Sequence, residues 1–325
     1  MSISPFQLAP YLAPRPWGGT RLETMFGVHS PEREKFGEAW VLSDRSEGSS
    51  RILDGRHEGR SFHEVVQNCP RVLLGCANPP PAYPLLIKYI DAALDLSVQV
   101  HPDDAYTQSR GLNDRGKTEC WYVVDCQPGT RIIHGLLPGV TREDLHQAIN
   151  EKRVQDCVRF LPIQPGLFLF VPPGTVHAIL GGTLICEIQQ SSDLTFRMWD
   201  WNRKPERKIH VEESLEVIQF GGPPQAEPIQ VPLPPDQGIL RIPLTSNEFF
   251  EVEAILLGVG ESLELPARKM GAILNGVSGT GFLDGQPLAV GSTFFIPAST
   301  EKVCLSTHKV PMIVLMSGTK EIAED

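Results

Sequence analysis

Two stretches of the chain share one pattern although they lie 125 residues apart. Residues 165–177 read PGLFLFVPPGTVH, and residues 290–302 read VGSTFFIPASTEK. Each contains a glycine, five mainly apolar residues, a proline and a turn, which is typical of a short buried strand that ends in a tight turn. In the second copy Lys302 replaces His177, and Ser299 replaces Gly174. The repeat predicts two β-barrels, of which the first retains the histidine.

A second match fixes the extent of the repeat. The Gly129-Thr130 and Gly279-Thr280 pairs are offset by 150 residues, which is 25 more than the offset of the first match. The difference is explained if a helix predicted at residues 141–158 is an insertion in the first copy. We therefore expect a mostly β fold of two barrels, with helices inserted in or flanking the first.

The rest of the chain fits this organisation. Its 29 prolines and 29 glycines separate strand-like runs of four to eight residues. A capping box at Ser61 and Glu64 predicts a helix that ends before Pro70, and a third helix is predicted at residues 210–220. The predicted units are a metal-binding domain (1–220), a proline-rich linker (221–238) and a second barrel without metal (239–325).

Composition excludes several function classes. The chain has 39 acidic and 29 basic residues, a net charge of −10, which argues against a broad nucleic-acid or membrane-binding face. No apolar run approaches membrane-spanning length, and the first residues do not resemble a signal peptide. Seven cysteines without a CxxC pair indicate reduced thiols. These features predict a cytoplasmic protein.

Side chains suited to a metal ion recur on neighbouring strands. Gln99 and His101 are two residues apart in LSVQVHP, so they point to the same face of a strand. Glu119 begins the next apolar strand, and His177 follows the turn at Gly174. Two imidazoles, a carboxylate and an amide oxygen suit Zn²⁺ or a similar divalent ion. Each residue alone could be structural; together they predict a metal site.

Further charged residues accompany these candidates. Lys117 lies two residues before Glu119, and Glu187 follows His177 on a later strand, so either could transfer a proton. Arg197 could stabilise an oxyanion, or it could be a surface arginine paired with Asp193 or Asp200. Lys88 lies in an otherwise apolar strand, where it either extends to solvent or faces an anion-binding pocket.

These motifs resemble a known family. The frame Gly166-x5-Pro172-x-Gly174-x2-His177 matches the second cupin motif. QVHP, the KTE at residues 117–119, PPGTVH and EIQQSSDLTFRMWDW together resemble the short bacterial form of the type I mannose-6-phosphate isomerases. The resemblance extends from RPWGG at residue 15 to the C-terminal barrel. Phe196 and Trp199 stand where tyrosines are common in the family, a conservative difference.

The resemblance implies two cupin-type (jelly-roll) barrels and an enzyme that interconverts mannose 6-phosphate and fructose 6-phosphate through a cis-enediol. One Zn²⁺ per chain would be held by Gln99, His101, Glu119 and His177. The resemblance also places other residues by role, with Arg197, Lys117 and Glu187 as catalytic and with Lys88 and Ser97 at the phosphate. Trp17 would line the pocket, although RPWGG alone reads as a turn with a buried tryptophan. The expected partner is a small sugar phosphate, and the expected assembly is a monomer or homodimer.

Two other functions are compatible with parts of this pattern. A cupin that senses sugar phosphates would keep the metal without turnover, but it would need fewer ionisable groups than Lys117, Glu187 and Arg197 provide. An iron-dependent cupin dioxygenase usually relies on three histidines or a compact HxH motif, and only His101 and His177 are in place here. The general base, Lys117 or Glu187, is left open by the sequence.

Overall fold

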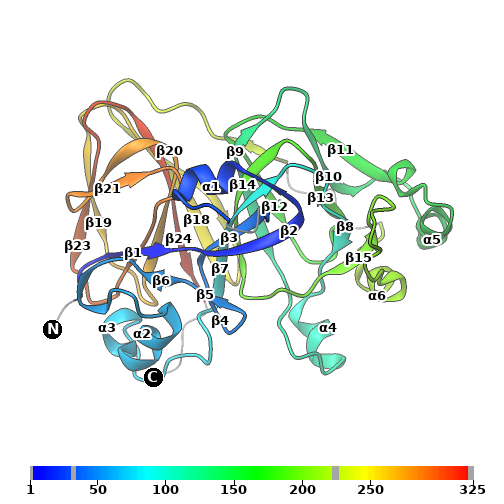
Figure 1. Cartoon of the computed structure of the whole chain (residues 1–325), viewed down its shortest axis with the longest axis horizontal. Helices are drawn as coiled ribbons and strands as arrows, with labels where there is room; N and C mark the ends of the chain where they lie inside the picture. The colour runs from blue at the N-terminus through cyan, green and yellow to red at the C-terminus, as the bar shows by residue number, and fades with distance from the viewer. Residues whose placement is uncertain (1–2, 31–33, 222–226, 321–325) are drawn as a thin grey trace.

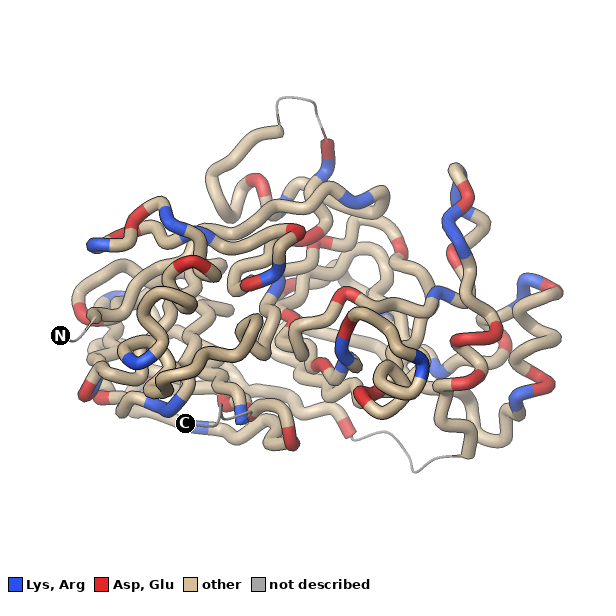
Figure 2. The backbone as a smooth tube through the Cα atoms, turned by 90° about the horizontal axis from the view of Figure 1, so that it is seen from below, with Lys and Arg blue, Asp and Glu red and all other residues tan. Residues whose placement is uncertain are grey.

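The computed structural model of the chain describes residues 3–30, 34–221 and 227–320. Strands hold far more of these residues than helices do, and they form two β-rich halves beside each other (Figure 1). The mostly β prediction is confirmed. No helix in the described ranges is long and apolar enough to cross a membrane. Acidic and basic residues are interspersed along the chain (Figure 2).

The first half consists of two sheets that face each other. The larger has the strand order β16-β12-β9-β14-β7-β2-β3, and the smaller has the order β11-β10-β13-β8-β15. The strands of the larger sheet are β16 (Ile229–Gln230), β12 (Leu167–Val171), β9 (Glu119–Cys126), β14 (Thr183–Gln190), β7 (Leu85–Ala92), β2 (Tyr11–Gly19) and β3 (Phe36–Leu42). Those of the smaller sheet are β11 (Val158–Pro162), β10 (Arg131–Leu136), β13 (His177–Ile179), β8 (Val98–Val100) and β15 (Phe196–Trp199).

Alternation along the strands assigns each side chain to one face of the larger sheet. On β7, Ile90 packs into the core between the two facing sheets, whereas Ile87 and Tyr89 pack into the core shared with the second half. On β9, Trp121 packs into the core between the facing sheets, and Tyr122 packs into the shared core. Strands β7 and β9 are therefore largely buried on both faces, and their polar residues on the inner face are held inside the first half.

The second half is a ten-stranded sheet curved around its own apolar core. Its strands are β17 (Ile239–Ser246), β18 (Phe250–Leu257), β19 (Ser262–Pro266), β20 (Ala272–Leu283), β21 (Gln286–Ala289), β22 (Thr293–Ile296), β23 (Lys302–Ser306) and β24 (Met312–Thr319), joined by β1 (Phe6–Ala9) and β6 (Arg51–Ile52). Strand β1 pairs with β22, Phe6 opposite Phe295. The N-terminal strand thus belongs to the C-terminal sheet. Of the predicted linker, residues 222–226 lie outside the described residues.

The structure contains the predicted repeat. Gly166 and Gly291 both adopt positive φ (86° and 90°), β12 and β22 follow them, and the next strand begins at His177 in one copy and at Lys302 in the other. In the first copy helix α5 (Arg142–Asn150) lies between β10 and β11, as the insertion argument predicted. In the second copy β20 continues directly into the hairpin with β21.

The three predicted helices begin where the sequence predicted, but two of them end earlier. Helix α2 (Phe62–Asn68) starts after Ser61, whose Oγ accepts a hydrogen bond from the N–H of Glu64 (3.1 Å). Helix α5 starts with a Thr141–Asp144 capping box, but it ends at Asn150, not near residue 158. Lys152 has φ of 58°, in the left-handed region, and a 3₁₀ turn (Val154–Asp156) and β11 follow. Helix α6 (Val211–Val217) lies within the third predicted range, 210–220, but ends three residues before its end.

Several N-terminal elements have no counterpart among the sequence predictions. RPWGG lies inside β2, not in a turn, and Trp17 is buried. The remaining elements are α1 (Arg21–Phe26), β4 (Asp44–Arg45), β5 (Gly48–Ser49), a 3₁₀ turn (Gly55–His57), α3 (Pro70–Leu73) and α4 (Asp104–Ser109). The sequence of β2, YLAPRPWGG, contains two prolines and little alternation of apolar and polar residues, so it does not resemble a strand. Its pairing with β3 and β7 fixes its extended conformation.

Candidate metal centre and pocket

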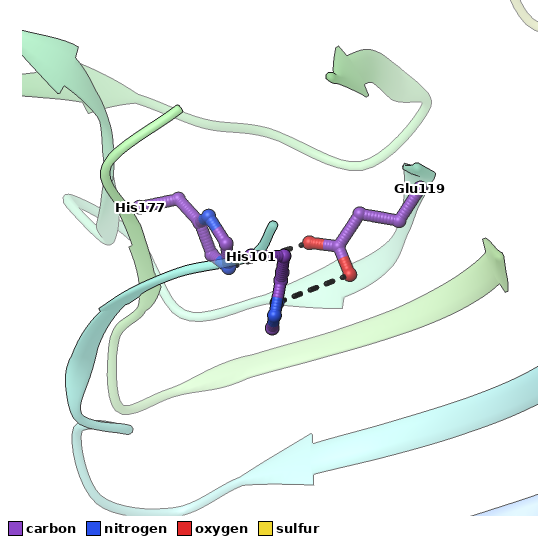
Figure 3. Close-up of side chains that lie close together, drawn as sticks. All are labelled: His101, Glu119 and His177. Carbon is purple, nitrogen blue, oxygen red and sulfur yellow. Dashed lines mark ion pairs between the residues drawn. The ribbon is translucent and has the colours of Figure 1, made fainter. Parts of the chain in front are cut away.

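Three predicted ligands converge between the facing sheets (Figure 3). His101 follows β8, Glu119 begins β9, and His177 begins β13. Nε2 of His177 is 3.4 Å from Oε1 of Glu119, and Nε2 of His101 is 3.7 Å from Oε2. All three residues are buried, and their ligand atoms lie within 4.8 Å of one another. These separations allow one ion to contact all three side chains.

The hydrogen bonds made by Nδ1 of each histidine show which ring nitrogen can accept a metal ion. Nδ1 of His101 contacts the carbonyl of Leu194 (2.8 Å), and Nδ1 of His177 contacts the carbonyl of Thr175 (2.9 Å). Because a carbonyl only accepts, Nδ1 carries the hydrogen and Nε2 keeps its lone pair. Burial lowers the pKa of both rings, that of His177 to about 4, so both are neutral. This is the arrangement found in metal-binding histidines.

Two of the candidate ligand atoms are buried without a hydrogen-bond partner in the described part of the chain, which also fits the binding of a divalent ion. Among the described residues, neither Nε2 of His101 nor Oε1 of Glu119 has a hydrogen-bond partner, although both atoms are buried. Unpaired buried polar atoms are destabilising unless something binds them. Gln99 lies directly opposite His177 in the β8–β13 pair: its amide nitrogen Nε2 is 3.2 Å from Nε2 of His177, and its oxygen Oε1 accepts a hydrogen bond from Oγ of Ser97 (3.2 Å). The structure therefore brings all four predicted ligands together.

The turn before His177 connects the ligands to each other. The N–H of Gly174 donates to the carbonyl of His101 (2.9 Å), so the two histidine segments are hydrogen-bonded through their backbones. Gly174 has φ of 79°, and a Cβ there would lie 2.8 Å from the carbonyl oxygen of Val217. Only glycine fits this position without strain.

A pocket of about 450 Å³ opens beside the three candidate ligands His101, Glu119 and His177. It is bordered by the other residues predicted from the sequence, together with Gln99. These residues are Trp17, Lys88, Ser97, Lys117, Glu187 and Arg197. The alternatives left open for Lys88 are thereby resolved in part: its side chain is buried and faces the pocket instead of extending to solvent.

Carboxylates surround the two pocket lysines. Nζ of Lys117 is 2.7 Å from Glu119 and 3.8 Å from Glu187. Burial alone would lower the pKa of Lys117, but the two carboxylates outweigh burial and raise it above the ordinary value. Nζ of Lys88 is 3.5 Å from Glu187 and 3.9 Å from both Glu38 and Asp193. Lys117 is therefore an ammonium ion, and both lysines lie within 4 Å of more than one carboxylate.

Arg197 shows neither of the ion pairs that would make it a surface residue. Its Nε donates to Oγ of Ser97 (3.1 Å), and its Nη1 donates to the carbonyl of Lys208 (3.1 Å). Asp200 pairs with Arg203 and Arg207 instead. Arg197 thus directs a positive charge into the pocket beside Ser97.

Sequence reasoning missed several pocket residues, notably Arg15, Glu38, Arg207 and His210. Glu38 accepts from Arg15 (3.1 and 2.9 Å) and from Nε1 of Trp40 (2.8 Å). The available signal was a lone carboxylate inside the apolar strand FGEAWVL, analogous to Lys88 in LLIKYIDA. No local pattern shows that these two strands are neighbours.

Glu38 provides a pH test of this wall of the pocket. Burial opposes ionisation, but Lys88 and Arg15 outweigh it and lower the pKa of Glu38 from 4.5 to about 2. A lowered pKa stabilises the fold above about pH 4.5, and the contribution, on the order of 3 kcal/mol, is lost as the pH falls toward about 2. The free energy of unfolding, measured with urea, should fall more steeply from about pH 4.5 to about 2 in the wild type than in Glu38→Gln. Equal slopes would contradict the ion-pair assignment.

Comparisons with known proteins identify relatives of this chain. Residues 6–119 match the model of the type I phosphomannose isomerase catalytic domain. The probable mannose-6-phosphate isomerase GmuF of Bacillus subtilis is 37% identical over 253 residues, which is 76% of this chain and 78% of the relative. The mannose-6-phosphate isomerase of Streptococcus mutans is 39% identical over 240 residues, 73% of each chain.

Solved structures show the same fold. The mannose 6-phosphate isomerase of Bacillus subtilis superposes with a TM-score of 0.86 at 29% identity, covering 97% of this chain and all of that one. A mannose 6-phosphate isomerase bound with zinc and yttrium has a TM-score of 0.75 at 19% identity, covering 98% of this chain and all of that one. The resemblance found in the sequence is therefore confirmed: this chain is an isomerase of the cupin fold and belongs to the type I phosphomannose isomerase family.

Proposed function

We propose that the chain interconverts mannose 6-phosphate and fructose 6-phosphate by proton transfer through a cis-enediol. The observation that carries this proposal is the position of Lys117 and Glu187, which border both the pocket and the cluster of predicted metal ligands. The names of the relatives support the substrate. A non-catalytic sensor would not require ionisable groups at this boundary.

The same donor set supports the choice of metal. Two neutral imidazoles, a carboxylate and an amide suit Zn²⁺, and we propose one ion per chain held by Gln99, His101, Glu119 and His177. When bound, the ion would supply a Lewis acid that stabilises negative charge on the substrate oxygens.

The reaction moves one proton from C2 to C1 of the open-chain aldose, while a hydroxyl proton moves from O2 to O1. We propose Glu187 as the base. Burial is the largest effect on its carboxyl and raises its pKa toward the range of an effective base. Oε1 accepts from Nε1 of Trp121 (3.1 Å), which orients the carboxylate. Lys117 keeps its proton and would donate a hydrogen bond to a substrate oxygen.

The base assignment can be tested directly. In Glu187→Gln we expect kcat to fall about 10²- to 10⁴-fold with little change in bound metal, because a positioned base contributes on this scale. Exchange of the C2 proton of substrate with D₂O, followed by NMR, should fall in parallel. Lys117→Met serves as the comparison. Turnover that survives in Glu187→Gln but not in Lys117→Met would move the base to Lys117.

The remaining pocket residues are proposed to bind the substrate or to stabilise its charge. We propose that Arg197 stabilises negative charge that develops on the substrate, and that Lys88, Ser97 and Trp17 contact the sugar phosphate. We also propose that residues 1–220 carry the site and residues 239–325 form a barrel without metal that supports β7. A cytoplasmic location and a monomer or homodimer stay predictions.

Turnover of mannose 6-phosphate, measured before and after chelation with Zn²⁺ added back, tests the proposed function. Metal-restored turnover is the expected result. Sugar-phosphate binding without turnover in the fully loaded protein would favour the sensing function instead.

A further inference from the structure

Lys117 is held in place by contacts that a strand does not provide. Residues 115–118 belong to neither a helix nor a strand, and β9 begins only at Glu119. Glu119 is fixed within the sheet, opposite Val171 on β12 and Gln189 on β14. Lys117 lies two residues earlier, outside this ladder, although it is buried and its Nζ is 2.7 Å from Glu119. Its position therefore depends on other hydrogen bonds.

The side chains of Asp104 and Gln190 supply two of these hydrogen bonds. Oδ1 of Asp104 accepts from the backbone N–H of Gly116 (2.7 Å), and Oε1 of Gln190 accepts from that of Thr118 (2.8 Å). Nε2 of Gln190 donates to Oδ2 of Asp104 (3.1 Å), which joins the two side chains. The N–H of Gln190 also donates to the carbonyl of Thr118 (3.0 Å). One connected pair of side chains therefore binds the N–H groups on both sides of Lys117.

The same segment packs closely against the start of α4. The N–H of Lys117 donates to the carbonyl of Pro102 (2.9 Å). A Cβ at Gly116 would lie 2.4 Å from backbone atoms of Asp103 and Asp104, so a larger residue would push the two segments apart. The residues before β9 are thus fixed against the start of α4 as well as against the end of β14.

Asp104 and Gln190 belong to two segments that carry other residues of the site. Asp104 follows His101 by three residues, and Gln190 follows Glu187 by three residues. The pair therefore connects the segment of a candidate metal ligand, the segment of Lys117 and the strand of the proposed base. Gln190 is fully buried, so water does not readily replace a hydrogen bond that it loses.

We propose that Asp104 and Gln190 are positioning residues for the isomerisation, because they fix the backbone of Lys117 and thereby direct its Nζ toward a substrate oxygen. This inference rests on the proposed function. Neither side chain is among those that border the pocket, so the pair acts through Lys117 and not by touching the substrate. A misplacement of about 1 Å at a reacting group costs on the order of 100-fold in rate, so the pair should affect kcat.

Exchanging the two side-chain functions tests the pair. Asp104→Asn places an amide NH₂ opposite the NH₂ of Gln190, and turning the Gln190 amide over only moves the mismatch to the N–H of Thr118. Gln190→Glu places two carboxylates against each other. In the double variant the new asparagine can donate to the new glutamate, and both backbone N–H groups again have an acceptor. The double variant also has the net charge of the wild type.

We expect kcat for mannose 6-phosphate to fall about 10- to 100-fold in each single variant and to return to within about fivefold of the wild type in the double variant. KM and bound metal should change by less than about threefold, because Glu119 and the pocket keep their own contacts. Moving the carboxylate to the buried position 190 costs desolvation, so rescue is measured by kcat and not by stability.

Asp103→Asn is the matched control. It removes the neighbouring negative charge, but asparagine can still accept the hydrogen bond from the N–H of Tyr106 (2.7 Å), so its kcat should stay within about twofold of the wild type. Equal kcat in Asp104→Asn and Asp103→Asn would overturn the proposal, as would single-variant losses that simply add in the double variant. If the double variant does not fold, Gln190→Met removes both side-chain hydrogen bonds without adding charge; an unchanged kcat there would also overturn the proposal.

Hydrogen exchange separates this proposal from the proposed function. In metal-loaded protein the backbone amides of residues 116–118 should exchange about 10-fold faster in Asp104→Asn than in Asp103→Asn, whether or not the protein turns over substrate. If that difference appears but the wild type does not isomerise mannose 6-phosphate, the proposed function fails and the hold on this segment stands. Wild-type turnover with unchanged kcat and exchange in Asp104→Asn would overturn the positioning role alone.

Discussion

Replacing Glu119 by glutamine should abolish metal binding and lower kcat/KM by at least about a thousandfold, equivalent to about 4 kcal/mol. Glutamine has nearly the same shape, but it removes the negative charge of a carboxylate whose oxygens lie 3.4 Å from Nε2 of His177 and 3.7 Å from Nε2 of His101. The carboxylate is fully buried, so no solvent compensates for its loss. Metal content by mass spectrometry and turnover should fall together.

A control for this variant exists in the second half of the chain. Glu264 pairs with Lys302, the position that corresponds to His177 in the repeat, and both side chains are largely exposed. Glu264→Gln should retain metal and activity. Stoichiometric metal in Glu119→Gln would show that Glu119 is not a ligand, whatever the activity.

Chelation of the wild type should also lower its melting temperature, because an ion that binds only the folded state stabilises that state by mass action. In Glu119→Gln the melting temperature should be insensitive to chelator. This comparison detects the ion without any reference to turnover.

Replacing Phe295 by alanine should destabilise the whole chain by about 3–5 kcal/mol. Phe295 is fully buried on β22, and its ring contacts Phe6 (5.5 Å), Phe62 (5.1 Å) and Tyr83 (5.8 Å) from the first part of the chain. The cavity would open in the core that the two halves share. Urea unfolding should show one transition with a lower midpoint.

Phe282→Ala is the matched control. Phe282 lies on β20 of the same sheet, is only partly buried, and contacts the ring of His308 (4.5 Å). Its loss should cost about 1 kcal/mol or less. Two separate unfolding transitions, with the first half unaffected by Phe295→Ala, would show that the halves fold independently and would contradict the shared core.

The second half packs against β7 and forms hydrogen bonds with residues on it and just before it. The hydroxyl of Tyr89 on β7 donates to the carbonyl of Gly276 (2.6 Å), and that of Tyr83 donates to the carbonyl of Met270 (3.0 Å). Lys88, next to Tyr89, points to the opposite face and into the pocket. The second half therefore holds the strand that carries a pocket residue.

The sequence was most informative where a function depends on local spacing. Gln99 and His101 had to share a face because side chains alternate along a strand, and the structure places them on that face. The turn at Gly174 was recognisable because few residues other than glycine adopt positive φ. Helix starts at Ser61 and Thr141 were predictable because capping side chains bind the first free N–H groups of their own helices.

The tertiary structure decided what lies opposite each predicted side chain. Alternation places Lys88 on the same face of β7 as Ile90, but it does not show that Glu38, Glu187 and Asp193 meet it there. The sequence likewise offered Asp200 as a partner for Arg197, and the fold gave Asp200 to Arg203 and Arg207. Strand period determines the direction of a side chain, whereas sheet order and register, set by contacts distant in sequence, determine its neighbours and hence its charge state and chemistry.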